Sequence, residues 1–433
     1  MNKLGLTKAI GDLPDAGAGN QWSNSLKRGR VPGPRLNEHK VIPDGLGPGT
    51  QCVHAGTYQD SRIGAVVSPI FQTTTFAFSN HSYASFAMGT TRDVPIYTRY
   101  GNPNQWSVQE KIATLEGAAS AVVFASGMAA IYTTLLALTN RGGHIVSAVD
   151  LYGGSYAFLK EDMHQVGREV TFVDPTDFAS IEKSIKPNTQ VLYFETLTNP
   201  LLKAIPLVQL GELARRLDLL LIVDNTFLSP VLLRPLDYGA HVVIHSCTKY
   251  LNGHSDLIAG VASGSRKYVD RIWAQMLKTG GHLEPLSCFL LERGLKTLEL
   301  RIQRQVANAD ALAAALAKNA NVQRVYHPRV EGYPYPWVAD YCASGYGGML
   351  SFEVAGGDEA ALRFVDKLTV PAVATSLGGV ESLVSLPFNT SHSVLTERQR
   401  SRIGINPGLV RVSTGIENTE DLVRDFDRAL ESI

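Results

Sequence analysis

The chain has 433 residues, with 40 Lys and Arg against 40 Asp and Glu, so its formal net charge is zero. Hydrophobic residues make up 44% and charged residues 18%, which excludes disorder as the main state because disordered chains are poor in apolar residues. The balanced charge also disfavours nucleic acid as a partner, since no surplus of Lys and Arg exists to neutralise phosphates. A chain of this length is expected to form two or three domains.

The sequence contains no apolar run that approaches the ~20 residues of a membrane-spanning helix, and no signal-peptide core follows Met1–Lys3. The cysteines lack the spacing of metal ligands and are too few for a disulfide framework. They are Cys52, Cys247, Cys288 and Cys342. We therefore predict a cytoplasmic protein with reduced thiols, no metal ion and no membrane partner.

The N-terminal part of the chain is irregular. Residues 1–50 are rich in Gly, Pro, Asn and basic residues and show no apolar period, which predicts a flexible or surface-lying arm. The arm continues to residue 97 with two short pieces that we expect to be extended, Val66–Ile70 and Thr73–Phe78.

Strand-like and helical segments alternate from Gln105 onward. The strand-like runs are continuously apolar, which is typical of a mostly parallel sheet buried between two layers of helices. The expected strands are Ala121–Phe124, His144–Ala148, Val170–Val173, Val191–Phe194, Leu219–Val223 and His241–Ile244. The expected helices are Val108–Leu115, Met128–Leu138, Tyr156–Val166 and Val208–Arg216. This region is predicted to be an α/β domain.

The pattern changes after Thr297. Leu300–Lys318 has apolar residues at helical spacing, and Gly348–Val354 is expected to be a strand. A last helix is predicted with Thr419 as its N-terminal cap. We predict a smaller C-terminal α+β domain.

Four of the predicted strands run into small, hydroxyl or charged residues that could build one site, because ligands of α/β sheets bind beyond the carboxyl ends of the strands. One of them, Val191–Phe194, runs into the segment 195–200, which begins with Glu195 and contains Asn199. Ser126 opens a helix whose N-terminus suits a phosphate, and Asp224 is a carboxylate at the rim of the core, suited to a protonated ring nitrogen. Lys249 follows an apolar strand and could attack a carbonyl. Taken singly, they could also be an ordinary turn, a capping aspartate and a surface lysine. Together they suggest pyridoxal phosphate (PLP).

Several ordered motifs carry a family resemblance. The most specific is His245–Asp256, which reads HSCTKYLNGHSD. The others are Tyr97–Pro103 (YTRYGNP), Leu151–Gly154 (LYGG), Asp224–Phe227 (DNTF), Ser376–Gly379 (SLGG) and Leu409–Glu417 (LVRVSTGIE). From about Gln51 to its end the chain resembles the Cys/Met-metabolism PLP enzymes, which include cystathionine synthases and lyases, methionine γ-lyase and homoserine sulfhydrylases.

The resemblance implies a fold-type I transferase with a seven-stranded sheet, and we expect an arm at 1–97, a cofactor domain at 98–298 and a C-terminal domain at 299–433. It also implies a homotetramer made of two catalytic dimers. Residues 51–97 would contact the neighbouring subunit, where Tyr97 and Arg99 would reach the cofactor phosphate.

The resemblance also implies residue roles. Lys249 would bind PLP covalently and move protons, Asp224 would pair with the ring nitrogen, and Tyr152 would stack on the ring and assist proton transfer. The phosphate would be bound by Ser126, Gly127, Met128, Ser246 and Thr248. The carboxylate of an amino-acid substrate would bind in two prongs to Arg411. The other substrate contacts would be Ser376, Asn199, Thr375 and Ile96.

The expected reaction is γ-replacement on an O-activated homoserine, as in a cystathionine γ-synthase. The alternatives are γ-elimination, as in a methionine or cystathionine γ-lyase, and a non-catalytic PLP-binding protein. Three positions depart from common family choices. Ile96 and Thr375 stand where many cystathionine enzymes carry an acid, and Gly154 stands where methionine γ-lyases often carry Cys. A nicotinamide dehydrogenase is disfavoured because the turn Ala125–Ala129 lacks the G-x-G-x-x-G pattern.

Overall fold

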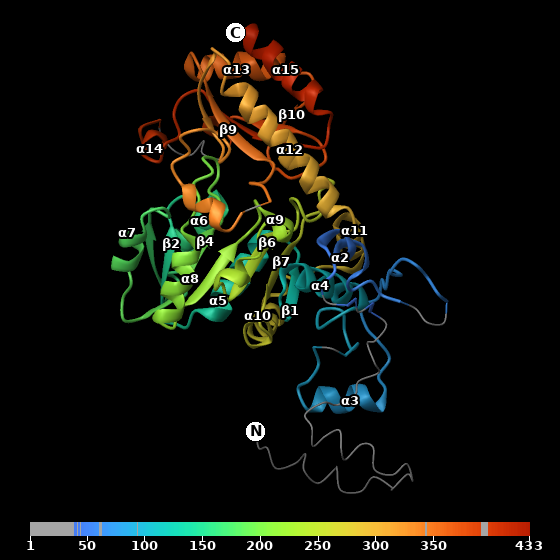
Figure 1. The fold of residues 1–433 in the computed structure, drawn as a ribbon. Helices are drawn as coiled ribbons and strands as arrows, with labels where there is room; N and C mark the ends of the chain where they lie inside the picture. The colour runs from blue at the N-terminus through green and yellow to red at the C-terminus, as the bar shows by residue number, and fades with distance from the viewer. Residues whose placement is uncertain are drawn as a thin grey trace, which may run out of the picture.

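The computed structural model describes residues 39–40, 42–43, 45–59, 63–92, 94–342, 344–390 and 397–433. Figure 1 shows a larger sheet in the middle of the chain, a smaller sheet near the C-terminus, and a long helix that joins them. The described part of the predicted arm contains α2 (Pro48–His54) and α3 (Asn80–Ala87). Of these, α3 lies away from both sheets (Figure 1). Most of the segment predicted to be flexible, residues 1–50, lies outside the described residues.

The larger sheet has seven strands in the order β1-β7-β6-β5-β4-β2-β3. The strands are β1 (Ser120–Phe124), β2 (His144–Ala148), β3 (Glu169–Val173), β4 (Thr189–Glu195), β5 (Leu220–Asp224), β6 (Val242–Ser246) and β7 (Gly260–Gly264). The pairs β3–β2, β2–β4, β4–β5 and β5–β6 are parallel, whereas β7 is antiparallel to both of its neighbours. The predicted mostly parallel sheet is confirmed.

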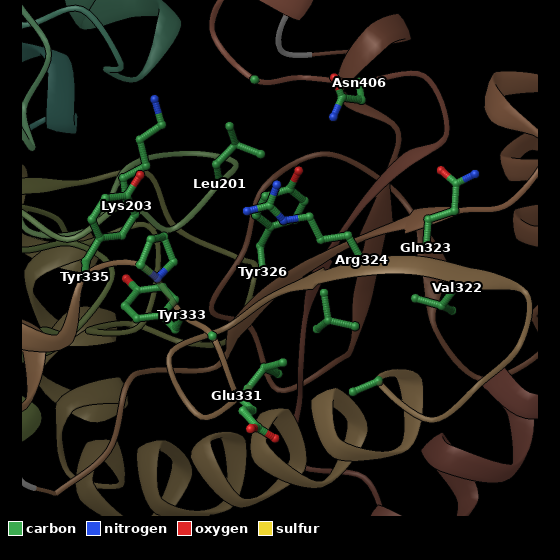
Figure 2. Close-up of a pocket in the computed structure, with 16 residues that line it drawn as sticks. Leu201, Lys203, Val322, Gln323, Arg324, Tyr326, Glu331, Tyr333, Tyr335 and Asn406 are labelled. Carbon is green, nitrogen blue, oxygen red and sulfur yellow. The ribbon is translucent and has the colours of Figure 1, made fainter.

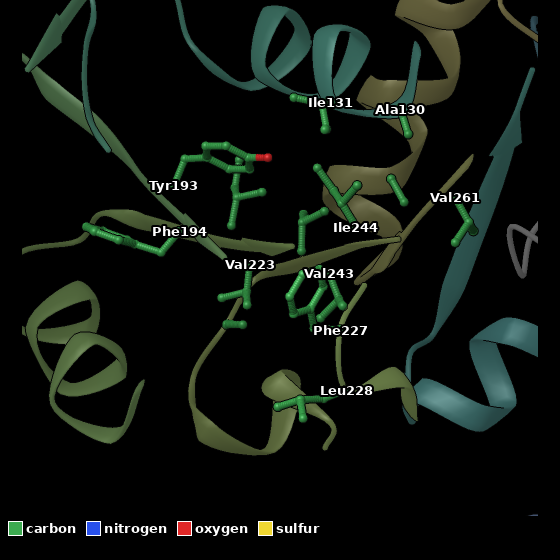
Figure 3. Packing of buried hydrophobic residues seen from close by; sticks show 14 of the residues in the cluster. Ala130, Ile131, Tyr193, Phe194, Val223, Phe227, Leu228, Val243, Ile244 and Val261 are labelled. Atoms are coloured by element: carbon green, nitrogen blue, oxygen red, sulfur yellow. The ribbon is translucent and has the colours of Figure 1, made fainter. Parts of the chain in front are cut away.

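Helices cover both faces of this sheet, so its strands are buried on both sides. Tyr193 and Phe194 are consecutive on β4 and both are fully buried. Figure 3 shows Tyr193 on the side of Ile131 of α5 and Phe194 turned to the other side. The elements around the sheet are α4 (Pro103–Glu116), α5 (Gly127–Leu138), α6 (Gly153–Ala157), η1 (Phe158–Asp162), α7 (Phe178–Lys183), α8 (Leu207–Arg216), α9 (Ser229–Leu232), η2 (Pro235–Tyr238), α10 (Arg266–Thr279) and α11 (Pro285–Leu295).

The strand β7 was not predicted. It is short and consists mainly of small residues, so it lacks the apolar run that marks the other strands. Close packing explains why the first residue of β7 is glycine. A Cβ on Gly260 would lie 2.3 Å from the carbonyl oxygen of Ser126. Glycine at this position therefore allows β7 to pass directly beneath the turn that opens α5.

The smaller sheet has the order β10-β11-β12-β9-β8. Its strands are β8 (Val322–Tyr326), β9 (Met349–Val354), β10 (Ala372–Val373), β11 (Leu383–Ser385) and β12 (Leu409–Ser413). The accompanying elements are α12 (Leu298–Leu316), η3 (Pro336–Asp340), α13 (Gly357–Lys367), η4 (Pro387–Asn389), α14 (Glu397–Arg402) and α15 (Thr419–Glu431). Its apolar cluster is separate from that of the larger sheet. The domain limits at 97 and 298 stay predictions.

The pieces at 66–70 and 73–78, which were expected to be extended, belong to neither sheet, and an isolated bridge joins Thr75 to Tyr97. Two local predictions are wrong. Asn418, not Thr419, is the N-cap of α15, and the Thr419 hydroxyl instead donates to Asn308 Oδ1 over 2.6 Å. The helix expected at 156–166 begins at Gly153 and continues as a π-helix to Asp162. No helix within the described residues is long and apolar enough to span a membrane.

Candidate active site

The carboxyl ends of β4, β5 and β6 place three residues side by side. Glu195 pairs in register with Asp224, and Asp224 pairs with Ile244. The buried Asp224 Oδ1 accepts bonds from the Thr226 amide (3.0 Å) and the Thr226 hydroxyl (2.5 Å). Burial raises the pKa of Asp224, and the Thr226 bonds oppose that rise. Within the described chain Oδ2 has no hydrogen-bond partner, so Asp224 can accept from a ligand N–H.

Lys249 lies in the turn that follows β6. Its Nζ is 2.7 Å from Ser376 Oγ, and none of the described acidic side chains forms an ion pair with it. Burial and then the nearby charge of Arg411 lower the pKa of Lys249 to about 8. This pKa leaves a far larger neutral fraction at neutral pH than an ordinary lysine has, and the neutral amine can act as a nucleophile and a base.

A phosphate-sized anion would find donors at the start of α5. Ser126 caps this twelve-residue helix, and its hydroxyl accepts from the Ala129 amide at 3.0 Å. A Cβ on Gly127 would lie 2.9 Å from Ser246 Cβ, so glycine lets β6 approach the free amides of the helix. The structure thus brings Ser126, Gly127 and Ser246 together as predicted. The hydroxyl of Thr248, by contrast, bonds to the backbone of Ala259.

Arg411 comes from β12 of the smaller sheet and is buried. Its Nη1 donates to Asn199 Oδ1 (3.1 Å) and its Nη2 donates to the Ser376 carbonyl (2.9 Å). Burial lowers the pKa of Arg411 to about 10, so the guanidinium remains charged at neutral pH. Arg411, Asn199 and Ser376 therefore form one cluster with Lys249, while the adjacent Thr375 is exposed.

Tyr152 lies at the N-terminus of α6, with 52% of its surface exposed. A Cβ on Gly154 would lie 2.7 Å from the Tyr152 ring and 3.2 Å from Met128 Sδ. The edge of the ring and the Met128 sulfur, which belongs to α5, therefore lie beside the same glycine. With the Tyr152 ring in this position, a side chain at residue 154 would displace it.

Three residues that were expected at the site lie around the predicted boundary between the arm and the cofactor domain. Ile96 is buried, and Tyr97 is 39% exposed. Arg99 donates from Nη1 to the carbonyl of Leu277 at 2.7 Å and lies over the ring of Tyr100. Their role at the phosphate of a neighbouring subunit stays a prediction.

Glu195 was not among the predicted site residues. It is buried at the end of β4, and its Oε1 accepts from the Tyr152 amide over 2.7 Å. The available signal was a single charged residue directly after the apolar run Val191–Phe194. Burial and then the charge of Asp224 raise the pKa of Glu195 well above its ordinary value.

A separate cavity of about 450 Å³ lies along β8 and contains none of the predicted site residues. Figure 2 shows Arg324 and Tyr326 side by side in this cavity, with Tyr333, Tyr335 and Lys203 nearby. Lys203 forms an ion pair with Asp150 at 2.6 Å. Among the described residues, no group of three or more His, Cys, Asp or Glu side chains could hold a metal ion.

The comparison with protein families decides the relationship. The sequence model described as "Cys/Met metabolism PLP-dependent enzyme" matches residues 49–431. The chain belongs to this family. As a family member it is a PLP-dependent enzyme of the trans-sulfuration type, which confirms the cofactor predicted from Asp224 and Lys249. The residues present fit PLP, since they offer a free acceptor, a reactive amine and open helix amides.

Three relatives illustrate the family. An L-methionine γ-lyase of Fusobacterium nucleatum subsp. polymorphum is 39% identical over 390 residues, covering 89% of this chain and 98% of the relative. A cystathionine β-lyase of Lactococcus lactis subsp. cremoris is 38% identical over 384 residues, covering 88% and 98%. The crystal structure of a cystathionine γ-lyase from Lactobacillus plantarum with L-serine has a TM-score of 0.83 and 36% identity, covering 90% and 99%. The fold of this PLP enzyme is therefore fold-type I, as predicted.

Proposed function

We propose that this chain is a carbon–sulfur lyase that carries out γ-elimination on a sulfur-containing amino acid. The observation that carries the proposal is the cluster in which Arg411 faces the amine of Lys249 across Ser376. Relatives named as lyases support elimination better than the γ-replacement that the sequence alone favoured. The absence of an acid at Ile96 and Thr375 favours a substrate without a distal ammonium group, such as methionine.

The residues divide the chemistry among them. PLP supplies an electron-withdrawing ring that stabilises the negative charge left when a proton departs from a carbon near the amino group. Arg411, held by Asn199, binds the carboxylate of the substrate in two prongs. Lys249 Nζ removes the proton from Cα, a task that suits an amine with a lowered pKa. The negatively charged carboxylate of Asp224 would pair with the positively charged ring nitrogen.

Elimination needs a second proton transfer. After Cα, a proton leaves Cβ and the Cγ–S bond breaks, so that the thiolate departs with the bonding electron pair. Tyr152 and Lys249 are the groups that can protonate the leaving sulfur and the remaining carbon chain. Addition of one water then gives a 2-oxo acid with four carbons, ammonia and the free thiol.

The complete site is proposed to need a second copy of the chain, within a homotetramer of two catalytic dimers. Large apolar side chains of the segment before residue 98 support this proposal, because a monomer rarely exposes them together. They are Ile63, Val66, Tyr83, Phe86 and Met88. Tyr97 and Arg99 of each copy would reach the phosphate of the other. The four cysteines are buried and form no disulfide, which supports the proposed cytoplasmic location.

The test supplies purified enzyme with L-methionine, L-cystathionine or O-acetylhomoserine, each with and without an added thiol. Elimination at Cγ predicts four-carbon 2-oxobutanoate and ammonia in a 1:1 ratio from methionine without a thiol. Pyruvate from cystathionine would instead indicate elimination at Cβ. Formation of a thioether from O-acetylhomoserine, with no 2-oxo acid from any substrate, would overturn the proposal in favour of γ-replacement.

A further inference from the structure

Glu195 occupies an unusual place for a carboxyl group. It lies on the strand next to that of Asp224, and the two residues are paired in register and both buried. Neighbouring strands are about 4.8 Å apart, so two ionised carboxylates here would repel each other strongly. The ring nitrogen of PLP contributes one positive charge and can balance only one of them.

The basic groups around this pair already have acidic partners. Lys203 Nζ is 2.6 Å from Asp150, and His245 Nε2 is 2.5 Å from Glu116 Oε1. None of the described basic side chains forms an ion pair with Glu195. Asp224 is the carboxylate placed to hold the ring nitrogen, so Glu195 is the group that must be neutral.

Glu195 contacts the backbone at the start of α6. Its Oε1 accepts the Tyr152 amide at 2.7 Å, and this bond fixes the start of α6, which presents the Tyr152 ring beside Met128. We propose that Glu195 is a positioning residue which, as a neutral carboxylic acid, holds the stacking Tyr152 in a fixed relation to Asp224. Its raised pKa agrees with this protonation state. The inference rests on the cofactor and not on the reaction that the enzyme performs.

The test uses holoenzyme without substrate. Its result can therefore be interpreted even if the proposed lyase activity is not found. The readouts are the visible circular dichroism of bound PLP, per mole of cofactor, and its dependence on pH. Glu195→Gln keeps a neutral planar group with an acceptor oxygen and is expected to match the wild type. Glu195→Leu keeps the volume but removes the acceptor. It is expected to lose dichroism at unchanged PLP content and to lower kcat about tenfold or more on the best substrate.

A matched control is Glu353→Leu, because Glu353 is also buried but bonds Tyr326 and Asn406 in the smaller sheet. This control is expected to lower thermal stability and leave the dichroism of PLP unchanged. If Glu195→Leu does not fold, Glu195→Asp, which withdraws the oxygen by one methylene, carries the same prediction. The proposal is overturned if Glu195→Gln is as damaging as Glu195→Leu, or if Glu195→Leu and Glu195→Asp both retain the wild-type spectrum.

Discussion

Lys249 and Arg411 are two cations that share one neighbour, Ser376. The hydroxyl of Ser376 contacts the lysine amine, and its carbonyl accepts from the arginine. The charge of Arg411 contributes to the lowered pKa of Lys249, which is about 8. The group that we propose to bind the substrate carboxylate therefore also increases the neutral fraction of the Lys249 amine.

Replacement of Lys249 tests its role most directly. Lys249→Ala is expected to bind PLP without a covalent bond and to lose at least ~10³-fold in turnover, because no other amine can take the Cα proton. Borohydride reduction followed by mass spectrometry should give a PLP-labelled peptide from wild type and none from the variant. Lys186→Ala, at an exposed ion pair with Glu169, is the control and should keep both label and activity. A labelled, active Lys249→Ala would refute the assignment.

The pH dependence of cofactor capture follows from the lowered pKa of Lys249. Only the neutral amine attacks an aldehyde, so the rate at which apoprotein binds PLP covalently should rise with pH and level off above about 8. Stopped-flow absorbance measures this rate. Arg411→Gln removes the neighbouring positive charge and should shift the midpoint upward. An unchanged midpoint in that variant would show that Arg411 does not influence the amine.

Thr375 tests the specificity argument at the same turn. Thr375→Glu adds an exposed acid next to Ser376 and should raise kcat/KM for L-cystathionine relative to L-methionine, because the distal ammonium group gains a partner worth about 1 kcal/mol or roughly fivefold. Thr375→Gln is the uncharged control and should leave the ratio near that of wild type. An identical ratio in both variants would reject electrostatic selection at this position.

Secondary structure elements were predictable where burial on both faces requires a continuous run of apolar residues. The strands β2, β4, β5 and β6 are recognisable from their apolar runs, and Asp224 and Lys249 lie at or just beyond the carboxyl ends of β5 and β6. The strand β7 was missed because it consists mainly of small residues, which allow close contact with neighbouring backbone, and it has no run of large apolar residues. Glu195 was missed because its importance comes from its pairing with Asp224 across β4 and β5. The sequence of a single strand does not reveal that pairing. Thr419 failed as a cap because α15 begins at Thr419 itself, so Asn418 takes the N-cap position, and the Thr419 hydroxyl donates to Asn308.

A substitution that adds one methyl group to β7 tests the close contact between this strand and the turn before α5. Gly260→Ala places a Cβ 2.3 Å from the Ser126 carbonyl oxygen, so this backbone must move. We expect a loss of about 1–3 kcal/mol in the free energy of unfolding and weaker PLP binding, measured by denaturant unfolding and cofactor titration. Gly47→Ala, with no atom within 4 Å of its Cβ, should change neither quantity. Equal behaviour of the two variants would contradict the packing argument.

At the scale of the whole molecule, the site draws on two separately packed sheets. Asp224 and Lys249 belong to the larger sheet, whereas Arg411 lies on β12 of the smaller one. Tyr97 and Arg99, at the predicted boundary between the arm and the cofactor domain, belong to neither sheet. Sequence motifs alone named all five residues, and the assignment of the last two to a neighbouring subunit follows from the family resemblance.

Subunit sharing predicts complementation between two inactive variants. Lys249→Ala lacks the amine and Arg99→Ala lacks the phosphate contact, so each homo-oligomer should have little activity. A mixed dimer contains one site with an intact Lys249 and an intact Arg99 from the partner. Unfolding and refolding the two variants together should therefore restore turnover, measured against each variant refolded alone. Proven mixed dimers without recovered turnover would show that Arg99 acts within its own chain.

The turn at Thr375 and Ser376 carries a practical consequence for enzyme engineering. Its backbone fixes the guanidinium while its side chain fixes the amine, so a library that varies this turn to widen the substrate range will also disturb acid–base chemistry. Selectivity and reactivity cannot be optimised one after the other here. Screens should score both traits in every round, and positions outside this turn offer safer starting points for altering preference alone.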